Sequence, residues 1–100
     1  MAEDPGTALE RYRAALQRYE RVRDAGGDSS REARRRALSL RREILSLEAR
    51  PLHEESLALE ERAEDAAAAG HRTEARELLR EAAALQEEIN RKYRGARYAR

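Results

Sequence analysis

Arginine carries the clearest chemical signal in this sequence, because six arginines and one acidic residue fall within the twelve residues from 31 to 42. A guanidinium group stays charged at physiological pH and can donate two parallel hydrogen bonds to a phosphate or a carboxylate. This run therefore has the chemistry of a phosphate-binding surface. Its candidate phosphate contacts are Arg34, Arg35, Arg41 and Arg42.

Residues 91–100 form a second basic run, in which five basic side chains alternate with two tyrosines. Charged and aromatic side chains together can contact the backbone and the bases of RNA or single-stranded DNA. Because Gly95 interrupts this run and no apolar face is present, we expect residues 94–100 to form a disordered basic tail. The candidate phosphate contacts of this run are Arg91, Lys92, Arg94 and Arg97.

An alternative for the first arginine run is that its charges are neutralised within the fold. Residues 54–65 hold six carboxylates, and arginines on the outer face of one helix can pair with carboxylates on a neighbouring helix. The formal net charge of +1 gives no field that would draw the whole chain onto nucleic acid or a membrane. A protein partner or a second copy of the chain, in a homodimer, is thus the first expectation, and nucleic acid is the alternative.

Residue types for catalysis or metal binding are few and unsuitably spaced. The sequence has no cysteine and two histidines. Neither His53 nor His71 belongs to a Glu-x-x-His pair, which would place two metal ligands on one helix face. A glycine-rich phosphate loop and a Gly-x-Ser-x-Gly nucleophile turn are also absent from the sequence. We therefore predict no enzyme activity, no cofactor, no metal ion and no small-molecule substrate.

Two tyrosines seven residues apart, Tyr12 and Tyr19, are candidate partner contacts. This spacing places both rings on the same face of a helix, and tyrosine is enriched at the energetic centres of protein interfaces. The alternative is that both rings edge the hydrophobic core with their hydroxyls in water. Because the chain has no Phe and no Trp, its core consists of small and medium aliphatic side chains, and such a thin core favours self-association.

Hydrophobic periodicity predicts that helices position all of these side chains. Two S/T-x-x-E capping boxes, which begin at Thr7 and Ser29, mark helix starts, and Gly70 suits a helix end. The predicted fold is an all-α, four-helix antiparallel bundle of two helical hairpins. Residues 1–6 are expected to be a flexible leader, and residues 7–93 a single helical domain. The expected helices are 8–25, 29–49, 52–69 and 72–93.

Pro51 decides between this architecture and a second one. A proline inside a helix removes one hydrogen bond and costs ~3 kcal/mol, and the apolar stripe changes phase between Leu47 and Leu52, so a helix break is predicted there. The alternative is three helices with a long central helix kinked at Pro51, because Leu45, Ala49 and Leu52 can be read as one continuous stripe. Three helices would leave apolar stripes that one chain cannot cover, and this alternative therefore predicts a dimer.

Residues 59–82 resemble a tetratricopeptide repeat, a helical hairpin in which small residues let two antiparallel helices approach closely. The matching residues are Leu59, Ala63, Gly70, Ala75, Leu79 and Ala82. The resemblance implies that the glycine ends the first helix and that the small residues line the seam between the helices. It also implies a scaffold that binds peptides or partner proteins.

These observations predict a non-catalytic helical module for protein–protein interaction or self-assembly. The alternative is a small nucleic-acid-associated protein that uses the cluster from Arg31 to Arg42 and the basic C-terminal tail. No apolar stretch approaches the ~18 residues that a membrane span requires, and the first residues lack the pattern of a secretion signal. We therefore expect no membrane partner and a cytoplasmic location.

Overall fold

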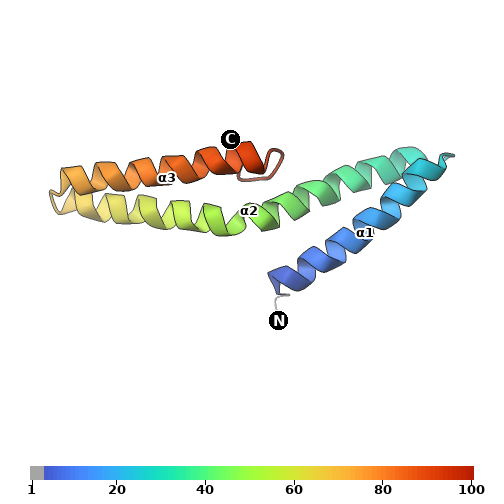
Figure 1. The fold of residues 1–100 in the computed structure, drawn as a ribbon, viewed down its shortest axis with the longest axis horizontal. Helices are drawn as coiled ribbons and strands as arrows, with labels where there is room; N and C mark the ends of the chain where they lie inside the picture. Colours follow the sequence, from blue (N-terminus) through green and yellow to red (C-terminus); the bar gives the residue numbers. More distant parts are fainter. Residues whose placement is uncertain (1–3) are drawn as a thin grey trace. The chain divides into compact units, whose positions relative to one another are not determined.

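The computed structural model describes residues 4–100, and this part of the chain folds into three α-helices. They are α1 (Pro5–Ala25), α2 (Ser30–Ala68) and α3 (Arg72–Lys92) (Figure 1). The chain divides into two units, Met1–Leu47 and Glu48–Arg100, which we call the N-terminal hairpin and the C-terminal hairpin. The first contains α1 and the beginning of α2, and the second contains the rest of α2 and α3. No helix in residues 4–100 combines the length and the hydropathy needed to cross a membrane.

The predicted break at Pro51 is wrong, and the fold has three helices instead of four. α2 is 39 residues long and contains Pro51 in its interior. A break would leave as many as four carbonyl and four N–H groups without helical partners, and no Gly, Asn, Asp or Ser lies between Leu47 and Glu55 to cap them. The proline itself removes one hydrogen bond. An ion pair of 2.9 Å between Arg50 and Glu54 also spans the proline on the helix surface.

The change of phase in the apolar stripe has another cause. In the N-terminal hairpin the buried side chains of α2 include Ala33 and Ala37, and in the C-terminal hairpin they include Leu59 and Ala63. These two sets belong to different faces of an ideal helix with 3.6 residues per turn. One continuous helix that has a different partner helix in each hairpin needs two apolar faces, so the stripe shifts without a break.

α1 begins three residues earlier than the capping box at Thr7 predicts. The carboxylate of Asp4 accepts hydrogen bonds from the backbone N–H groups of Gly6 and Thr7, at 3.1 and 3.4 Å. Pro5 fits the first turn because its missing N–H would have no helical partner there. Residues 5 and 6 of the predicted leader are therefore helical, and residues 1–3 lie outside the described part.

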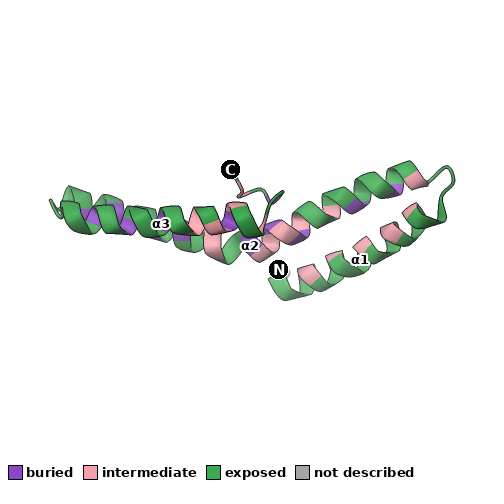
Figure 2. Cartoon of the chain, turned by 45° about the horizontal axis from the view of Figure 1, so that its top comes forward, coloured by how far each residue is buried: buried purple, intermediate pink, exposed green. Residues whose placement is uncertain are grey.

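The C-terminal hairpin has a closed seam of small residues. α3 buries Ala75, Leu78, Ala82 and Ile89, and the last of these is fully buried (Figure 2). The hydroxyl of Ser56 in α2 donates a hydrogen bond of 3.3 Å to the backbone carbonyl of Ala82. The turn at Gly70, with a φ of 83°, confirms the predicted end of the preceding helix. The core cluster of this hairpin consists of Leu59, Ala63, Ala66, Ala75, Leu78 and Ala82.

The N-terminal hairpin is covered less completely. Ala8 is the buried residue of α1, whereas most of its apolar side chains are half-buried (Figure 2). Polar contacts also join α1 to α2. Arg41 donates a hydrogen bond of 3.0 Å to Glu20, and the hydroxyl of Ser30 donates to the carbonyl of Arg23 at 3.1 Å. The half-buried apolar side chains of α1 are Leu9, Tyr12, Ala15, Leu16 and Tyr19.

Residues 93–100, most of which the sequence assigns to a disordered tail, follow α3 as a series of turns that lie against the C-terminal hairpin. The ring of Tyr98 stacks on His53 of α2, with 4.1 Å between the ring centroids and 15° between the planes. The side chain of Gln86 donates to the carbonyl of Tyr98 at 2.8 Å, and the backbone N–H of Arg100 donates to Asn90 at 2.8 Å. The tail thus has specific contacts with both helices of its hairpin.

Candidate functional site

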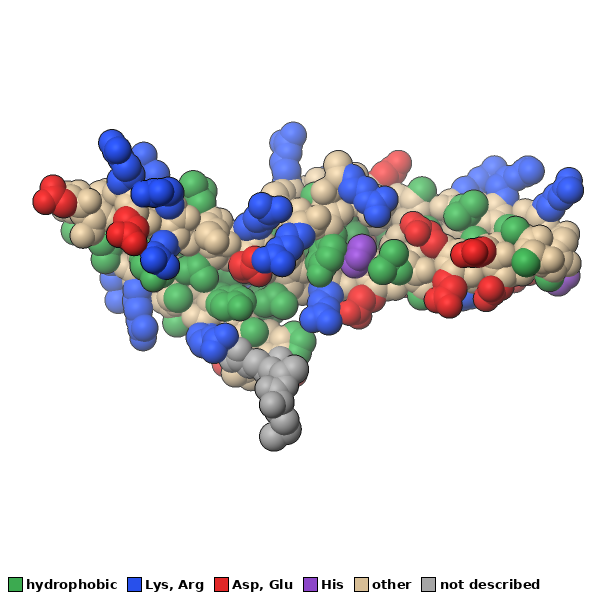
Figure 3. Space-filling model, turned by 180° about the vertical axis from the view of Figure 1, so that it is seen from behind, with side chains coloured by type: hydrophobic (Ala, Val, Ile, Leu, Met, Phe, Trp, Pro, Cys, Tyr) green, Lys and Arg blue, Asp and Glu red, His purple; other side chains and the backbone are tan. Residues whose placement is uncertain are grey.

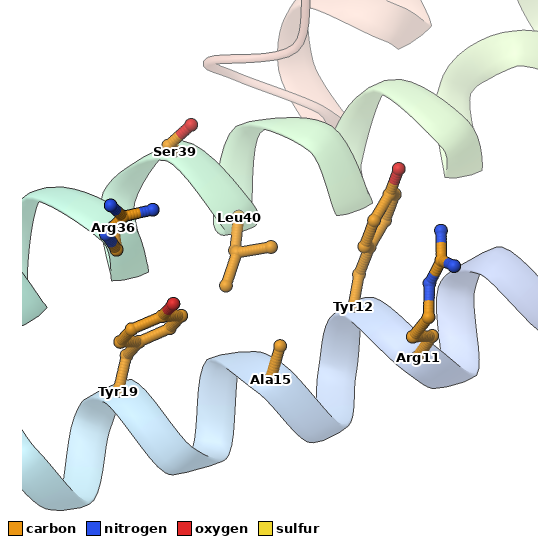
Figure 4. A pocket seen from close by; sticks show the side chains of 7 residues that line it. All are labelled: Arg11, Tyr12, Ala15, Tyr19, Arg36, Ser39 and Leu40. Atoms are coloured by element: carbon orange, nitrogen blue, oxygen red, sulfur yellow. The ribbon is translucent and has the colours of Figure 1, made fainter.

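A groove of about 360 Å³ lies between α1 and the first part of α2 in the N-terminal hairpin. In the close view, Ala15 of α1 and Leu40 of α2 point toward each other, and the two tyrosines stand on either side of them (Figure 4). The floor is therefore apolar and the walls are aromatic. We call this site the tyrosine groove; its lining residues are Arg11, Tyr12, Ala15, Tyr19, Arg36, Ser39 and Leu40.

The groove arises from the order of side-chain sizes along α1. Tyr12, Ala15 and Tyr19 follow one another at steps of three and four residues, which places them on one helix face. A methyl group between two large rings leaves space that Leu40 on the facing helix only partly fills. Closely packed protein interiors have few voids of this size, so this face of the N-terminal hairpin is incompletely covered.

A second depression of about 370 Å³ continues the groove toward the turn between α1 and α2. It shares Tyr19 and Arg36 with the tyrosine groove. It is also lined by Val22, which is 41% exposed to solvent. From Tyr12 to Val22 the α1 axis advances about 15 Å, because each helical residue adds 1.5 Å. That length matches about three turns of a docking helix.

The polar groups that line the groove can all donate hydrogen bonds, although the hydroxyls, unlike the guanidinium groups, can accept them as well. The guanidinium of Arg11 lies 5.5 Å from the centre of the Tyr12 ring. Arg36 makes an exposed ion pair with Glu32 at 3.4 Å, and an exposed pair of this kind contributes about 1 kcal/mol or less. Neither tyrosine hydroxyl has a hydrogen-bond partner among residues 4–100. Phenol and guanidinium donors beside an apolar floor suit a partner that presents carboxylates next to an aliphatic side chain.

The four predicted phosphate contacts of the first arginine run have two different environments. Arg41 pairs with Glu20 of α1 at 3.0 Å. Arg41 thus pairs with a carboxylate on a neighbouring helix, as one alternative expects, but the partner is Glu20 and not one of residues 54–65, which lie on α2 itself. Arg34, Arg35 and Arg42 are exposed, and their side chains have no ion-pair partner within the described residues.

The predicted contacts of the second basic run are also divided. Lys92 donates a hydrogen bond of 2.6 Å to Glu88, and this bond, together with the positive charge of Lys92, lowers the pKa of the Glu88 carboxyl. Arg91, Arg94 and Arg97 are exposed. Because Tyr98 stacks on His53, its ring is already occupied by a contact within the hairpin, which weakens the case for base stacking by the tail.

The sequence pointed to Tyr12 and Tyr19 but missed the rest of the groove. The signal that could have revealed it is Ala15, a small residue midway between two aromatic residues on one helix face. The contribution of Arg36 and Leu40 depends on how α2 is aligned with α1, which the periodicity of either helix alone does not determine. No group of three or more histidine, aspartate or glutamate side chains in residues 4–100 is arranged to hold a metal ion.

Comparisons of this chain with protein-family models, with curated proteins and with solved structures found no match. The resemblance of residues 59–82 to a tetratricopeptide repeat therefore stays a prediction from the sequence.

Proposed function

We propose that this chain is a non-catalytic helical interaction module that binds another protein, or a second copy of itself, through the tyrosine groove. The observation that carries the proposal is the incomplete covering of α1. This helix buries Ala8, whereas Tyr12 and Tyr19 stay half-buried beside a groove with an apolar floor. Tyrosine is among the side chains that dominate binding energy at protein interfaces.

Covering the groove would remove apolar surface from water. Each 100 Å² of apolar surface that becomes buried contributes roughly 2.5 kcal/mol before the entropic cost of association. The two tyrosines lose little conformational entropy on binding, because each has only two side-chain torsions and is already held on one side by the hairpin. A helix that lays an apolar face into this groove would follow a common mode of peptide recognition.

Light scattering coupled to size exclusion tests the self-association arm. The wild-type mass is expected to rise above the 11.4 kDa of one chain as concentration increases. The double substitution Tyr12→Ala/Tyr19→Ala should keep the chain monomeric over the same range. Leu79→Ala, which alters a residue 52% exposed on α3, is the matched control and should behave as the wild type does.

Fluorescence anisotropy with a labelled, helical, acidic amphipathic peptide tests the second arm, in which the partner is another protein. Binding to the wild type and to Leu79→Ala, with loss in the double tyrosine variant, is the expected result. A wild type that stays monomeric and binds no such peptide would contradict the proposal.

A second candidate is association with nucleic acid. It is favoured by Arg34, Arg35 and Arg42, which are exposed and have no ion-pair partner among residues 4–100. Electrostatic binding to phosphates is strongest at low salt, so labelled duplex DNA and single-stranded RNA should be titrated there first. Arg34→Gln/Arg35→Gln is expected to weaken binding more than Arg91→Gln/Arg94→Gln. The absence of any binding at low salt would exclude this candidate.

A further inference from the structure

We propose that the occupant of the tyrosine groove is a second copy of this chain, which inserts the acidic face of its own α2 around Leu57. This inference rests on the proposed function and adds to it the identity of the partner and of the partner surface. We call this surface the acidic face; it consists of Leu57, Glu60 and Glu61. Its residues lie in the C-terminal hairpin, whereas the groove lies in the N-terminal hairpin.

The two hairpins carry opposite charge. Residues 1–47 contain eleven arginines and eight carboxylates, which gives +3, whereas residues 48–100 contain ten basic and twelve acidic side chains, which gives −2. The basic side chains that line the tyrosine groove are Arg11 and Arg36, and Arg36 also pairs with Glu32 at 3.4 Å. Complementary surface potentials of this kind guide association and select the partner.

The acidic face presents an aliphatic side chain beside unpaired carboxylates. Leu57 is 46% exposed, and Glu60 and Glu61 follow it at three and four residues, so all three share one side of α2. Both glutamates are exposed and have no ion-pair partner in the described part of the chain. The space-filling view shows carboxylates (red) gathered along the C-terminal hairpin (Figure 3).

The groove of the same chain cannot receive this face. Arg36 and Leu40 of the groove and Leu57 of the acidic face all belong to α2, which is continuous from Ser30 to Ala68. A helix does not fold back on itself, so residues near its start cannot dock on residues near its end. A second copy supplies the face without requiring any change in α2.

A dimer in which two tyrosine grooves face each other would be less stable than one in which each groove receives an acidic face. In a symmetric contact both copies use the same surface, so a groove-to-groove contact would bring together two rims that are each lined by Arg11 and Arg36. Like charges placed together at an interface cost several kcal/mol. The acidic face instead offers Leu57 to the apolar floor at Ala15 and offers carboxylates to the guanidinium and phenol donors.

Each chain carries one groove and one acidic face, so two copies can satisfy each other reciprocally. Exchange of the contact in both directions between the same two copies closes the assembly at two chains. The expected assembly is a dimer that weakens as salt is added, because charges at a partly exposed interface are screened by ions.

Charge reversal on each side tests this arrangement. Arg11→Glu/Arg36→Glu changes the groove, Glu60→Arg/Glu61→Arg changes the acidic face, and each variant alone should lose about a hundredfold or more in dimer affinity. An equimolar mixture of the two variants should dimerise again, because each reversed surface meets its reversed counterpart and each native surface meets a native one. Glu77→Arg/Glu81→Arg, at two exposed positions of α3, makes the same change in net charge away from both surfaces and should dimerise as the wild type does.

Restoration in the mixture also demonstrates that both variants are folded, and circular dichroism of each variant alone checks its helix content. Dimerisation that the tyrosine substitutions abolish but neither charge reversal affects would overturn this inference and leave the proposed function standing. A wild type that stays monomeric at low salt but binds the acidic peptide would also overturn this inference and leave the proposed function standing. Loss in both variants without restoration in the mixture would also overturn it.

Discussion

α1 and α3 have the same length, 21 residues, and each packs against a part of α2, but they cover their apolar faces to very different degrees. α3 buries four residues and α1 buries one. The difference lies in the side chains at the seam. Small residues such as Ala75 and Ala82 let the C-terminal hairpin close on itself, whereas Tyr12 and Tyr19 flank Ala15 and leave a groove in the N-terminal hairpin. Similar amphipathic helices can therefore build either a closed element or a surface that is open to a partner.

One substitution made at three alanines would test this contrast directly. Ala82 is 3% exposed, Ala15 is half-buried in the groove and Ala83 is exposed, so Ala→Asp at these positions changes helix propensity equally and burial unequally. Because an unpaired buried charge is very unfavourable, Ala82→Asp should lower the free energy of unfolding by about 3 kcal/mol or more. We expect about 1 kcal/mol for Ala15→Asp and about 0.5 kcal/mol for Ala83→Asp.

Urea titration followed by circular dichroism gives the total loss of stability in each variant, and hydrogen exchange assigns that loss to a hairpin. Equal losses of stability in Ala82→Asp and Ala15→Asp would contradict the contrast, because they would mean that the groove excludes water as completely as the closed seam does.

Pro51→Ala should have the next largest effect. The substitution restores one helical hydrogen bond and removes a steric clash, which together stabilise the folded state by ~3 kcal/mol. It also raises the conformational entropy of the unfolded chain, which offsets about 1 kcal/mol of this gain. A net gain of about 2 kcal/mol in the free energy of unfolding is expected, and the new amide at position 51, which would donate to the carbonyl of Leu47, should be protected from exchange. Glu55→Ala, at an exposed position of the same helix, is the control for helix propensity. A loss of stability in Pro51→Ala would contradict a continuous α2.

Tyr98→Ala probes how the tail completes the C-terminal hairpin. Loss of the ring that stacks on His53 at 4.1 Å should lower the free energy of unfolding by about 1 kcal/mol. The affected amides in hydrogen exchange should be those near Gln86 and Asn90, since both side chains hold the same tail segment. Arg94→Ala, at an exposed residue, should change neither quantity. Unchanged exchange in Tyr98→Ala would mean that the docked tail does not protect this hairpin in solution.

The smallest effect concerns the exposed ion pair at the end of α3. The hydrogen bond from Lys92, followed by the Lys92 charge, lowers the pKa of Glu88, and Arg91 lowers it less. Because the folded pKa lies below that of the unfolded chain, the stabilisation is present above the ordinary glutamate value and is lost as the pH falls through the lowered value. Lys92→Gln should raise the Glu88 pKa in an NMR titration more than Arg91→Gln does, and the opposite order would contradict the assigned cause.

Local signals in the sequence predicted the helical class and the turns, because a turn depends on a few adjacent residues. The turn that begins at Gly26 and the one at Gly70, both with positive φ, lie where the sequence placed them. The architecture at Pro51 could not be read in the same way. A shift in the phase of an apolar stripe has two physical causes, a helix break or a change of packing partner, and the sequence does not distinguish them.

Long-range pairings were the other limit. Arg41 has a partner 21 residues away in Glu20, and the tail is held by the stacking of Tyr98 on His53. Each contact depends on the alignment of two elements, whereas periodicity describes one element at a time. Tyr12 and Tyr19 could be identified because their spacing lies within a single helix, but the Arg36 and Leu40 side of the groove could not.

The alanine seam of the C-terminal hairpin also restricts which sequences can encode it. At positions such as Ala63 and Ala82, 2% and 3% exposed, a larger side chain would force the helices apart, and insertions of this kind cost about 1–3 kcal/mol in a well-packed core. Glycine, alanine and serine are therefore the residues that these sites accept most readily without moving the helices apart. The rim of the tyrosine groove is open and has no such steric limit, so substitutions there are expected to leave the packing of the C-terminal hairpin unchanged.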